Sequence, residues 1–182
     1  MIVAPTEFTV RGITYSIRVA VAEDAAALSH LRVQIDGESE NLDRESGEDY
    51  IDAEQFAQII KRDNDSPRHL FLVATVDKRI VGFSRCAGTQ LKRLSHKVEF
   101  GVCVLKQFWG NGIGKHLLQQ SMSWADSSGI KKMVLYVLET NENAIKLYKK
   151  LGFEVEGILK QDKLLSDGNY YNTLVMSRIN ES

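Results

Sequence analysis

Alternating and continuous apolar segments along the chain predict a series of β-strands. Residues 13–20, ITYSIRVA, alternate in polarity and are rich in β-branched side chains, as expected of a strand with one buried face. Residues 96–105, HKVEFGVCVL, are apolar enough for a central strand. Similar patterns predict five further strands, over residues 69–76, 79–88, 132–138, 153–160 and 170–179. Tight hairpin turns are expected at Asp77-Lys78 and through SDGN at 166–169.

Four other segments have the spacing and composition of helices. Residues 22–35 are rich in alanine and leucine, and a second helix is expected over 52–62, after a polar loop. A third follows a glycine-rich segment, continues to about residue 127 and is ended by Gly129. A fourth ends at Gly152, and its apolar face is formed by Ala144, Leu147, Tyr148 and Leu151 at positions i, i+3, i+4 and i+7.

The predicted elements therefore follow the order β-α-α-β-β-β-α-β-α-β-β. The β-α-β unit over 96–138 should be a right-handed crossover between parallel strands, whereas the hairpins on either side make the sheet mixed. We expect a three-layer α/β domain over residues 13–182, preceded by an N-terminal extension over residues 1–12.

Composition narrows the class of protein without defining its chemistry. The chain has 182 residues, with 23 Lys and Arg against 24 Asp and Glu, which gives no support to nucleic-acid or membrane-surface binding. Its two cysteines form no disulfide framework, its four histidines lack metal-ligand spacing, and no metal is expected. The first residues do not form a signal peptide and no apolar run is long enough for a membrane span, so we expect a cytoplasmic protein.

The segment FWGNGIGKHLL, residues 108–118, carries the most specific chemical information. Glycines without Cβ atoms at the start of a helix expose backbone N–H groups at the positive end of the helix dipole, which is a suitable cradle for phosphate. The spacing does not fit a Rossmann fingerprint. It does not fit a Walker loop either, because His116 stands where that loop has a hydroxyl. A glycine-rich turn without a ligand remains the alternative.

The same segment resembles motif A of the GNAT superfamily of N-acetyltransferases, [Q/R]xxGxG/A, with Gly112 and Gly114 at the glycine positions. Residues 139–157, ETNENAIKLYKKLGFEVEG, resemble the motif B of that family, and the element order also agrees. The resemblance is therefore to a small, single-domain, bacterial-type member and covers nearly the whole chain. One departure is Trp109, which stands where the family has an Arg or Gln that supports the pyrophosphate loop.

The resemblance implies acetyl-CoA as acetyl donor, with its pyrophosphate on the amides of 110–115 and its pantetheine arm along the strand at 102–105. An extended arm that carries amides can pair with an open strand edge as a peptide does. The expected cofactor-binding residues are Val102, Cys103, Val104, Leu105, Gly110, Asn111, Gly112, Ile113, Gly114, Lys115, Asn141, Asn143 and Tyr148. Asn141 has the alternative role of capping the helix that follows it.

Two side chains are candidates for proton transfer during catalysis. Tyr148 occupies the position of the tyrosine that usually serves as general acid in the family; its alternative role is that of a packed aromatic residue. Glu99 is a candidate base, because it lies on an otherwise apolar strand, where the burial of an unpaired carboxylate is costly unless it has a function. Alternatively, Glu99 pairs with a nearby cation, and a chain of waters takes the proton. The backbone N–H of Val104 or Leu105 could stabilise the oxyanion.

These features together predict an N-acetyltransferase that moves an acetyl group to a primary amine by direct transfer in a ternary complex. A non-catalytic acyl-CoA sensor of the same fold is the first alternative and a phosphate-binding NTPase the second. The acceptor is expected to be a small-molecule amine or a protein amine, and a homodimer can form through the terminal strands. The loop over 36–54 is strongly acidic, which suggests a cationic acceptor; simple solvation of the loop is the alternative.

Overall fold

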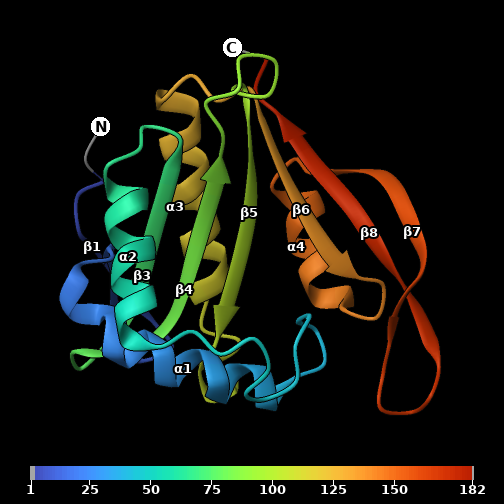
Figure 1. The fold of residues 1–182 in the computed structure, drawn as a ribbon, viewed down its shortest axis with the longest axis horizontal. Coiled ribbons are helices and arrows are strands. Elements are labelled where there is room, and N and C mark those ends of the chain that lie inside the picture. The colour runs from blue at the N-terminus through green and yellow to red at the C-terminus, as the bar shows by residue number, and fades with distance from the viewer. Residues whose placement is uncertain (1–2, 182) are drawn as a thin grey trace.

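An eight-stranded mixed sheet forms the centre of the molecule in a computed structural model that describes residues 3–181 (Figure 1). The strands are β1 (Thr6–Val10), β2 (Ile13–Val19), β3 (His69–Val76), β4 (Arg79–Gly88), β5 (Lys97–Val104), β6 (Lys132–Leu138), β7 (Glu154–Leu164) and β8 (Tyr170–Ile179). Their spatial order is β1-β2-β3-β4-β5-β6-β8-β7. Within the described residues, β5 and β6 form a parallel pair and every other neighbouring pair is antiparallel.

Helices cover both faces of this sheet. They are α1 (Ala25–Glu38), α2 (Ala53–Asn64), α3 (Ile113–Ser127) and α4 (Glu142–Lys150), with short 3₁₀ turns η1 (Ala22–Asp24) and η2 (Lys106–Phe108). Two successive residues of β4 show the layering, because side chains alternate between the faces of a strand. Arg85 pairs with Asp63 of α2, whereas Cys86 contacts Ser121 of α3. The mixed α/β class and the three-layer arrangement are therefore confirmed.

Local sequence accounts for most element boundaries. Asp52 accepts a hydrogen bond from the backbone N–H of Gln55, and the Gln55 side chain accepts one from the N–H of Asp52, so a capping box starts α2. Asp77 and Lys78 have φ values of 47° and 66°, as a tight hairpin turn requires. None of the helices within residues 3–181 is long and apolar enough to cross a membrane.

The N-terminal segment differs from the expectation of a simple extension, because it contributes strand β1 to the sheet. Phe8 lies opposite Tyr15 in the antiparallel pair of β1 with β2. The Phe8 ring also stacks on the imidazole of His116, at the start of α3, with ring centroids 3.9 Å apart. A five-residue edge strand has little apolar periodicity of its own, and its partner across the hairpin determines its conformation.

Strands β5 and β6 separate after only three paired positions. Lys97 lies opposite Lys132, and the pairing ends where Glu99 meets Val134. Beyond that point β5 stays paired with β4, while β6 stays paired with β8 over its full length. Figure 1 shows the two strands diverging toward their carboxyl ends. The sheet is therefore split on the side where α3 and α4 begin.

We expect Phe8→Ala to lower the free energy of unfolding by about 1–3 kcal/mol, less than for a fully buried Phe because the ring is half-exposed. Thermal or urea denaturation measures this change. Glu7→Ala is the matched control, since Glu7 is exposed on the same strand. Equal stabilities of the two variants would show that β1 contributes no packing at α3.

Candidate active site

A cleft of about 560 Å³ lies in the gap between β5 and β6. Its walls come from β5 and β6, the segment that enters α3, the first turns of α4, and the loop after α1. Twelve of the residues expected at the site line it, namely Glu99, Val102, Cys103, Val104, Gly110, Gly112, Ile113, Gly114, Lys115, Asn141, Asn143 and Tyr148. Leu105 and Asn111 do not. The fold thus brings β5 and α4, which are about 50 residues apart in the sequence, to the same cleft.

The backbone of β5 explains why Val104 faces the cleft and Leu105 does not. The N–H of Leu105 donates to the carbonyl of Val81 in β4 at 2.9 Å, and Leu105 is fully buried. In an antiparallel pair, successive residues direct their backbone groups alternately toward and away from the partner. The N–H and C=O groups of Val104 and Val102 therefore point into the gap. The N–H of Leu105 is thus already bonded within the sheet and is not free to donate to an oxyanion.

The glycine-rich segment bends sharply as it enters α3. Gly110 and Gly112 have φ values of 79° and 77°, in the left-handed region that favours glycine. Gly114 differs, because it lies inside α3 and, among residues 3–181, no atom beyond its chain neighbours and its own helix backbone lies within 4 Å of the position that a Cβ would take. Gly114 lines the cleft, so this open volume faces it. This is the space that a phosphate group needs to approach the helix start.

A buried chain of hydrogen bonds holds this loop from behind. Tyr15 of β2 donates its hydroxyl proton to the carbonyl of Asn111 at 3.0 Å, and the Nδ1 of His116 lies 2.6 Å from the same hydroxyl. Because the phenol has one proton, His116 Nδ1–H is the donor in the second bond. Burial lowers the pKa of His116, which favours its neutral form. These two hydrogen bonds fix the orientation of the glycine-rich loop.

Asn111 supports the loop with its side chain rather than lining the cleft. Its amide donates to the carbonyls of Phe108 and Trp109 at 3.0 and 3.3 Å, and the residue is buried. The side chain of Asn111 is thus occupied within the loop, and its carbonyl accepts from Tyr15, so only its backbone N–H is left to face a ligand.

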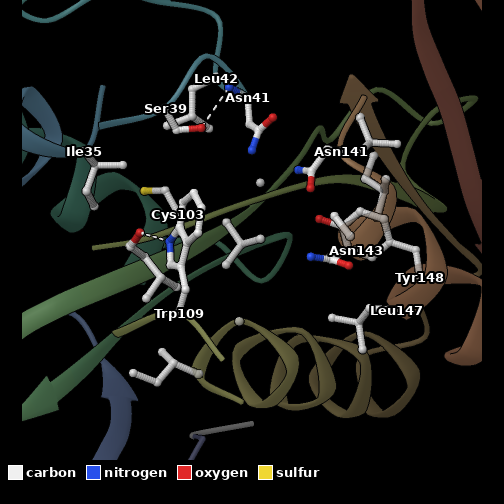
Figure 2. A pocket seen from close by; sticks show the side chains of 18 of the residues that line it. Ile35, Ser39, Asn41, Leu42, Cys103, Trp109, Asn141, Asn143, Leu147 and Tyr148 are labelled. Atoms are coloured by element: carbon white, nitrogen blue, oxygen red, sulfur yellow. Dashed lines mark hydrogen bonds between the residues drawn. The ribbon is translucent and has the colours of Figure 1, made fainter. Parts of the chain in front are cut away.

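The opposite wall presents polar groups that make no hydrogen bond within residues 3–181. Asn141 occupies the N-cap position of α4, but its side chain does not cap the helix. In Figure 2 the amides of Asn141 and Asn143 point toward the cavity. The Tyr148 hydroxyl likewise has no bonded partner among these residues, while its ring packs against Phe153 at 6.0 Å. Burial raises the pKa of Tyr148 to about 12, so the phenol keeps its proton at neutral pH.

Two titratable side chains of β5 line the same cleft. Glu99 is exposed, and within residues 3–181 its carboxylate forms no ion pair, although Lys97, His96 and Arg93 are close in sequence. Cys103 is half-buried, and burial raises the pKa of its thiol. A thiol held protonated is a poor nucleophile.

Sequence reasoning missed how Trp109 contributes to the site. The indole N–H donates to the carbonyl of Val104 at 2.8 Å, and the Lys106 ammonium lies 5.9 Å from the ring centroid. The ring therefore covers the end of the open β5 edge. Residues of the acidic segment over 36–54, which the sequence suggested as a contact for the acceptor, also line the cleft. Lys163 of β7 lines it too and was not expected, because no motif identifies this position in advance.

This arrangement, an open strand edge beside a glycine-rich helix start, is that of an acyl-transferring domain. The Acetyltransferase (GNAT) family model matches residues 35–153, which is more than half of the chain. The chain therefore belongs to the GNAT acetyltransferase family and is an N-acetyltransferase. The acetyl donor of this family is acetyl-CoA.

Known proteins similar to the chain agree with this assignment. It is 30% identical to the L-amino acid N-acetyltransferase AaaT of Escherichia coli K12 over 164 residues, covering 90% of this chain and 96% of that protein. The crystal structure of a GNAT-family acetyltransferase from Streptococcus pneumoniae superposes with a TM-score of 0.88 at 26% identity, covering 91% and 99% of the two chains. The structure of yncA from Salmonella typhimurium, which contains acetyl-CoA, shares the fold with a TM-score of 0.80 at 20% identity over 92% and 95%.

We expect Gly114→Val to weaken acetyl-CoA binding about tenfold or more, because its branched side chain would fill the space that the pyrophosphate needs. Gly114→Ala is the matched control, since the family motif accepts alanine at this position. It should leave the affinity nearly unchanged and raise thermal stability slightly, because glycine costs up to about 1 kcal/mol in a helix. Calorimetric titration and thermal melting measure the two effects. Unchanged affinity in a folded Gly114→Val protein would remove the loop from the binding site.

Proposed function

We propose that the protein transfers the acetyl group of acetyl-CoA directly to a primary amine within a ternary complex. The observation that carries this proposal is that one cleft joins the glycine-rich helix start, the unpaired edge of β5 and the unbonded hydroxyl of Tyr148. A binding module would need the first two features alone. The proton donor beside them favours catalysis over the role of an acyl-CoA sensor.

The residues of the cleft fit acetyl-CoA in chemistry and in arrangement. Backbone N–H groups of 110–115 and the Lys115 ammonium would hold the pyrophosphate at the start of α3. Val102 would pair with the amides of the pantetheine arm through its backbone N–H and C=O groups, supported by the side chains of Asn141 and Asn143, whereas the C=O of Val104 already accepts from Trp109. The half-buried Cys103, between the two valines, would contribute to the wall beside the arm.

Acetyl-CoA supplies a thioester, whose C–S bond breaks as the acceptor nitrogen forms a C–N bond. The N–H of Val104, directed into the gap, is suited to stabilise negative charge on the carbonyl oxygen. The Tyr148 O–H would donate its proton toward the departing sulfur. Because its pKa is about 12 and a thiol has a pKa near 8.5, this donation stabilises the thiolate chiefly through a hydrogen bond until solvent completes the transfer.

The amine has to lose a proton, and Glu99 is the candidate that would take it. Its carboxylate lines the cleft at the point where β5 and β6 separate, and it has no competing ion pair among the described residues. Carboxylates are in general much weaker bases than amines. The contribution of Glu99 would therefore be to orient the amine and relay the proton to water.

Relatives indicate the range of acceptors in this family. Curated proteins similar to parts of the chain include a spermidine N(1)-acetyltransferase of Escherichia coli and a ribosomal protein bS18-alanine N-acetyltransferase of Haemophilus influenzae. AaaT, which is similar over most of the chain, is named for L-amino acids. We therefore propose a small amine, in a reducing cytoplasm consistent with two free cysteines, and a homodimer through the terminal strands.

We expect Tyr148→Phe to lower kcat about 10²-fold while leaving the acetyl-CoA Kd nearly unchanged, because only a proton donor is lost. With a pKa of about 12, Tyr148 does not titrate below pH 10, so both proteins should show the same pH profile up to that value. Steady-state assays from pH 6 to 10 and calorimetry measure these quantities. Tyr170→Phe, at an exposed position of β8, is the control. Full turnover by Tyr148→Phe would make the residue structural.

We expect Cys103→Ala to retain most of its turnover, because the protonated thiol takes no covalent part in direct transfer. Incubation with radiolabelled acetyl-CoA in the absence of an amine should leave no label on the protein. A labelled cysteine, or loss of all turnover in a folded variant, would indicate a two-step reaction through an acetyl-enzyme.

A further inference from the structure

The far end of the cleft opens into a second groove of about 920 Å³. The α1–α2 loop lies between the two cavities, and eight residues line both of them: Glu38, Ser39, Asn41, Leu42, Asp43, Arg44, Trp109 and Lys163. We call this region the acceptor end. If the proposed function holds, the second substrate reaches the thioester through it, since the opposite end is occupied by the phosphate loop.

Two carboxylates at the acceptor end form ion pairs with neighbouring cationic side chains. Asp36 is buried and accepts hydrogen bonds from Arg44 at 3.1 and 3.4 Å. Asp43 forms an ion pair with the Lys163 ammonium of β7 at 2.5 Å. Each pair is neutral as a unit, so neither presents a net negative charge to a ligand.

Two further carboxylates, at the end of α1 and in the loop that follows it, accept hydrogen bonds from backbone N–H groups. Glu38 accepts from the N–H of Lys106 at 2.7 Å, and Glu40 accepts from the N–H of Ser166, in the turn between β7 and β8, at 2.9 Å. These bonds tie the segment to η2 and to the β7–β8 hairpin. Part of the acidity that suggested a cationic acceptor therefore fastens this segment, while both carboxylates keep their charge.

The surfaces of the acceptor end that carry no such bonds are apolar. Ile35 is buried at the base, Leu42 packs against the core from the loop, and Cys103 lies between them in Figure 2. The Trp109 ring, 48% exposed, forms the side nearest Val104. An exposed indole held by a hydrogen bond offers a flat apolar surface to whatever binds there.

One polar group at the acceptor end lacks a partner. The Asn41 backbone N–H bonds to the Ser39 hydroxyl at 3.0 Å, but its side-chain amide forms no hydrogen bond within residues 3–181. Figure 2 shows this amide pointing into the cavity, across from the amides of Asn141 and Asn143. An amide both donates and accepts, so it can hold a neutral amine without adding charge.

We propose that the acceptor is a monoamine with an apolar substituent, oriented by Asn41 and packed against Ile35, Leu42 and Trp109. The acceptor end disfavours polyamines, because a second ammonium group would lose its hydration against the apolar wall, and the two carboxylates that line both cavities, Glu38 and Asp43, already have partners. This inference takes the reaction from the proposed function. The class of ligand follows from the residues of the acceptor end alone.

Four acceptors that differ only in two groups test this proposal. Pentylamine and norleucine end in a methyl group; cadaverine and lysine carry an ammonium group at the same place. Norleucine and lysine also carry a carboxylate. We expect the terminal ammonium to lower kcat/KM about tenfold or more, with and without the carboxylate. Equal or better use of cadaverine than of pentylamine would overturn the proposal.

Calorimetric titration of the CoA-loaded protein with the same amines separates this inference from the proposed function. Tighter binding of pentylamine than of cadaverine supports the ligand class even if no acetyl group is transferred. The reverse order contradicts it even if transfer occurs. Failure of acetyl-CoA to bind or react would instead count against the proposed function.

Substitutions in the loop test the residues themselves. Asn41→Ala should raise the KM for pentylamine about three- to tenfold, the range of one net hydrogen bond, with an unchanged acetyl-CoA Kd and melting temperature. Glu45→Gln is the control, because this exposed carboxylate forms no bond within residues 3–181 and should affect no acceptor. An unchanged KM in Asn41→Ala, or a raised cadaverine KM in Glu45→Gln, would contradict the proposal.

Discussion

Every polar backbone group in a protein interior needs a partner, and the split between β5 and β6 leaves one edge of β5 without a neighbouring strand. After Glu99 meets Val134, the backbone groups of Val102 and Val104 face a cavity instead of a neighbouring strand. Such an edge is tolerable only where water or a ligand replaces the missing strand. The positions of α3, α4 and the α1–α2 loop all follow from this gap, because each covers one of its sides.

The glycine-rich loop depends on the N-terminal strands for its shape. Tyr15 and His116 form a buried chain to the Asn111 carbonyl, and Phe8 covers the imidazole. Positive φ values at Gly110 and Gly112 let the chain turn, but they do not fix the direction of its N–H groups. The hydrogen bonds of β2 and α3 fix it. The shape of the loop at one edge of the gap therefore depends on packing at the far edge of the sheet.

Much of the fold could be predicted from the sequence, because local patterns determine it. β3, β4, β6 and β8 have the expected bounds, and the helices differ by a few residues at their ends. Strand β1 was missed, since a short edge strand gains its conformation from β2. Glycine spacing located the helix start, but the bond of Leu105 to Val81 and the inward turn of Asn111 depend on three-dimensional neighbours. The charge of the α1–α2 loop was visible in the sequence, whereas the partners that use it were not.

Two segments more than 120 residues apart, joined at Glu40 and Ser166, enclose the acceptor end, whereas the donor side is built on the sheet and its helices. In the proposed assignment, the chemistry of transfer and the choice of acceptor would be encoded in separate parts of the chain. Inherited changes in the loop and hairpin would then alter the preferred amine and leave the groups that bind acetyl-CoA intact. A family with this division can diversify rapidly, provided that both segments change together, because a loop paired with a foreign hairpin loses its closure.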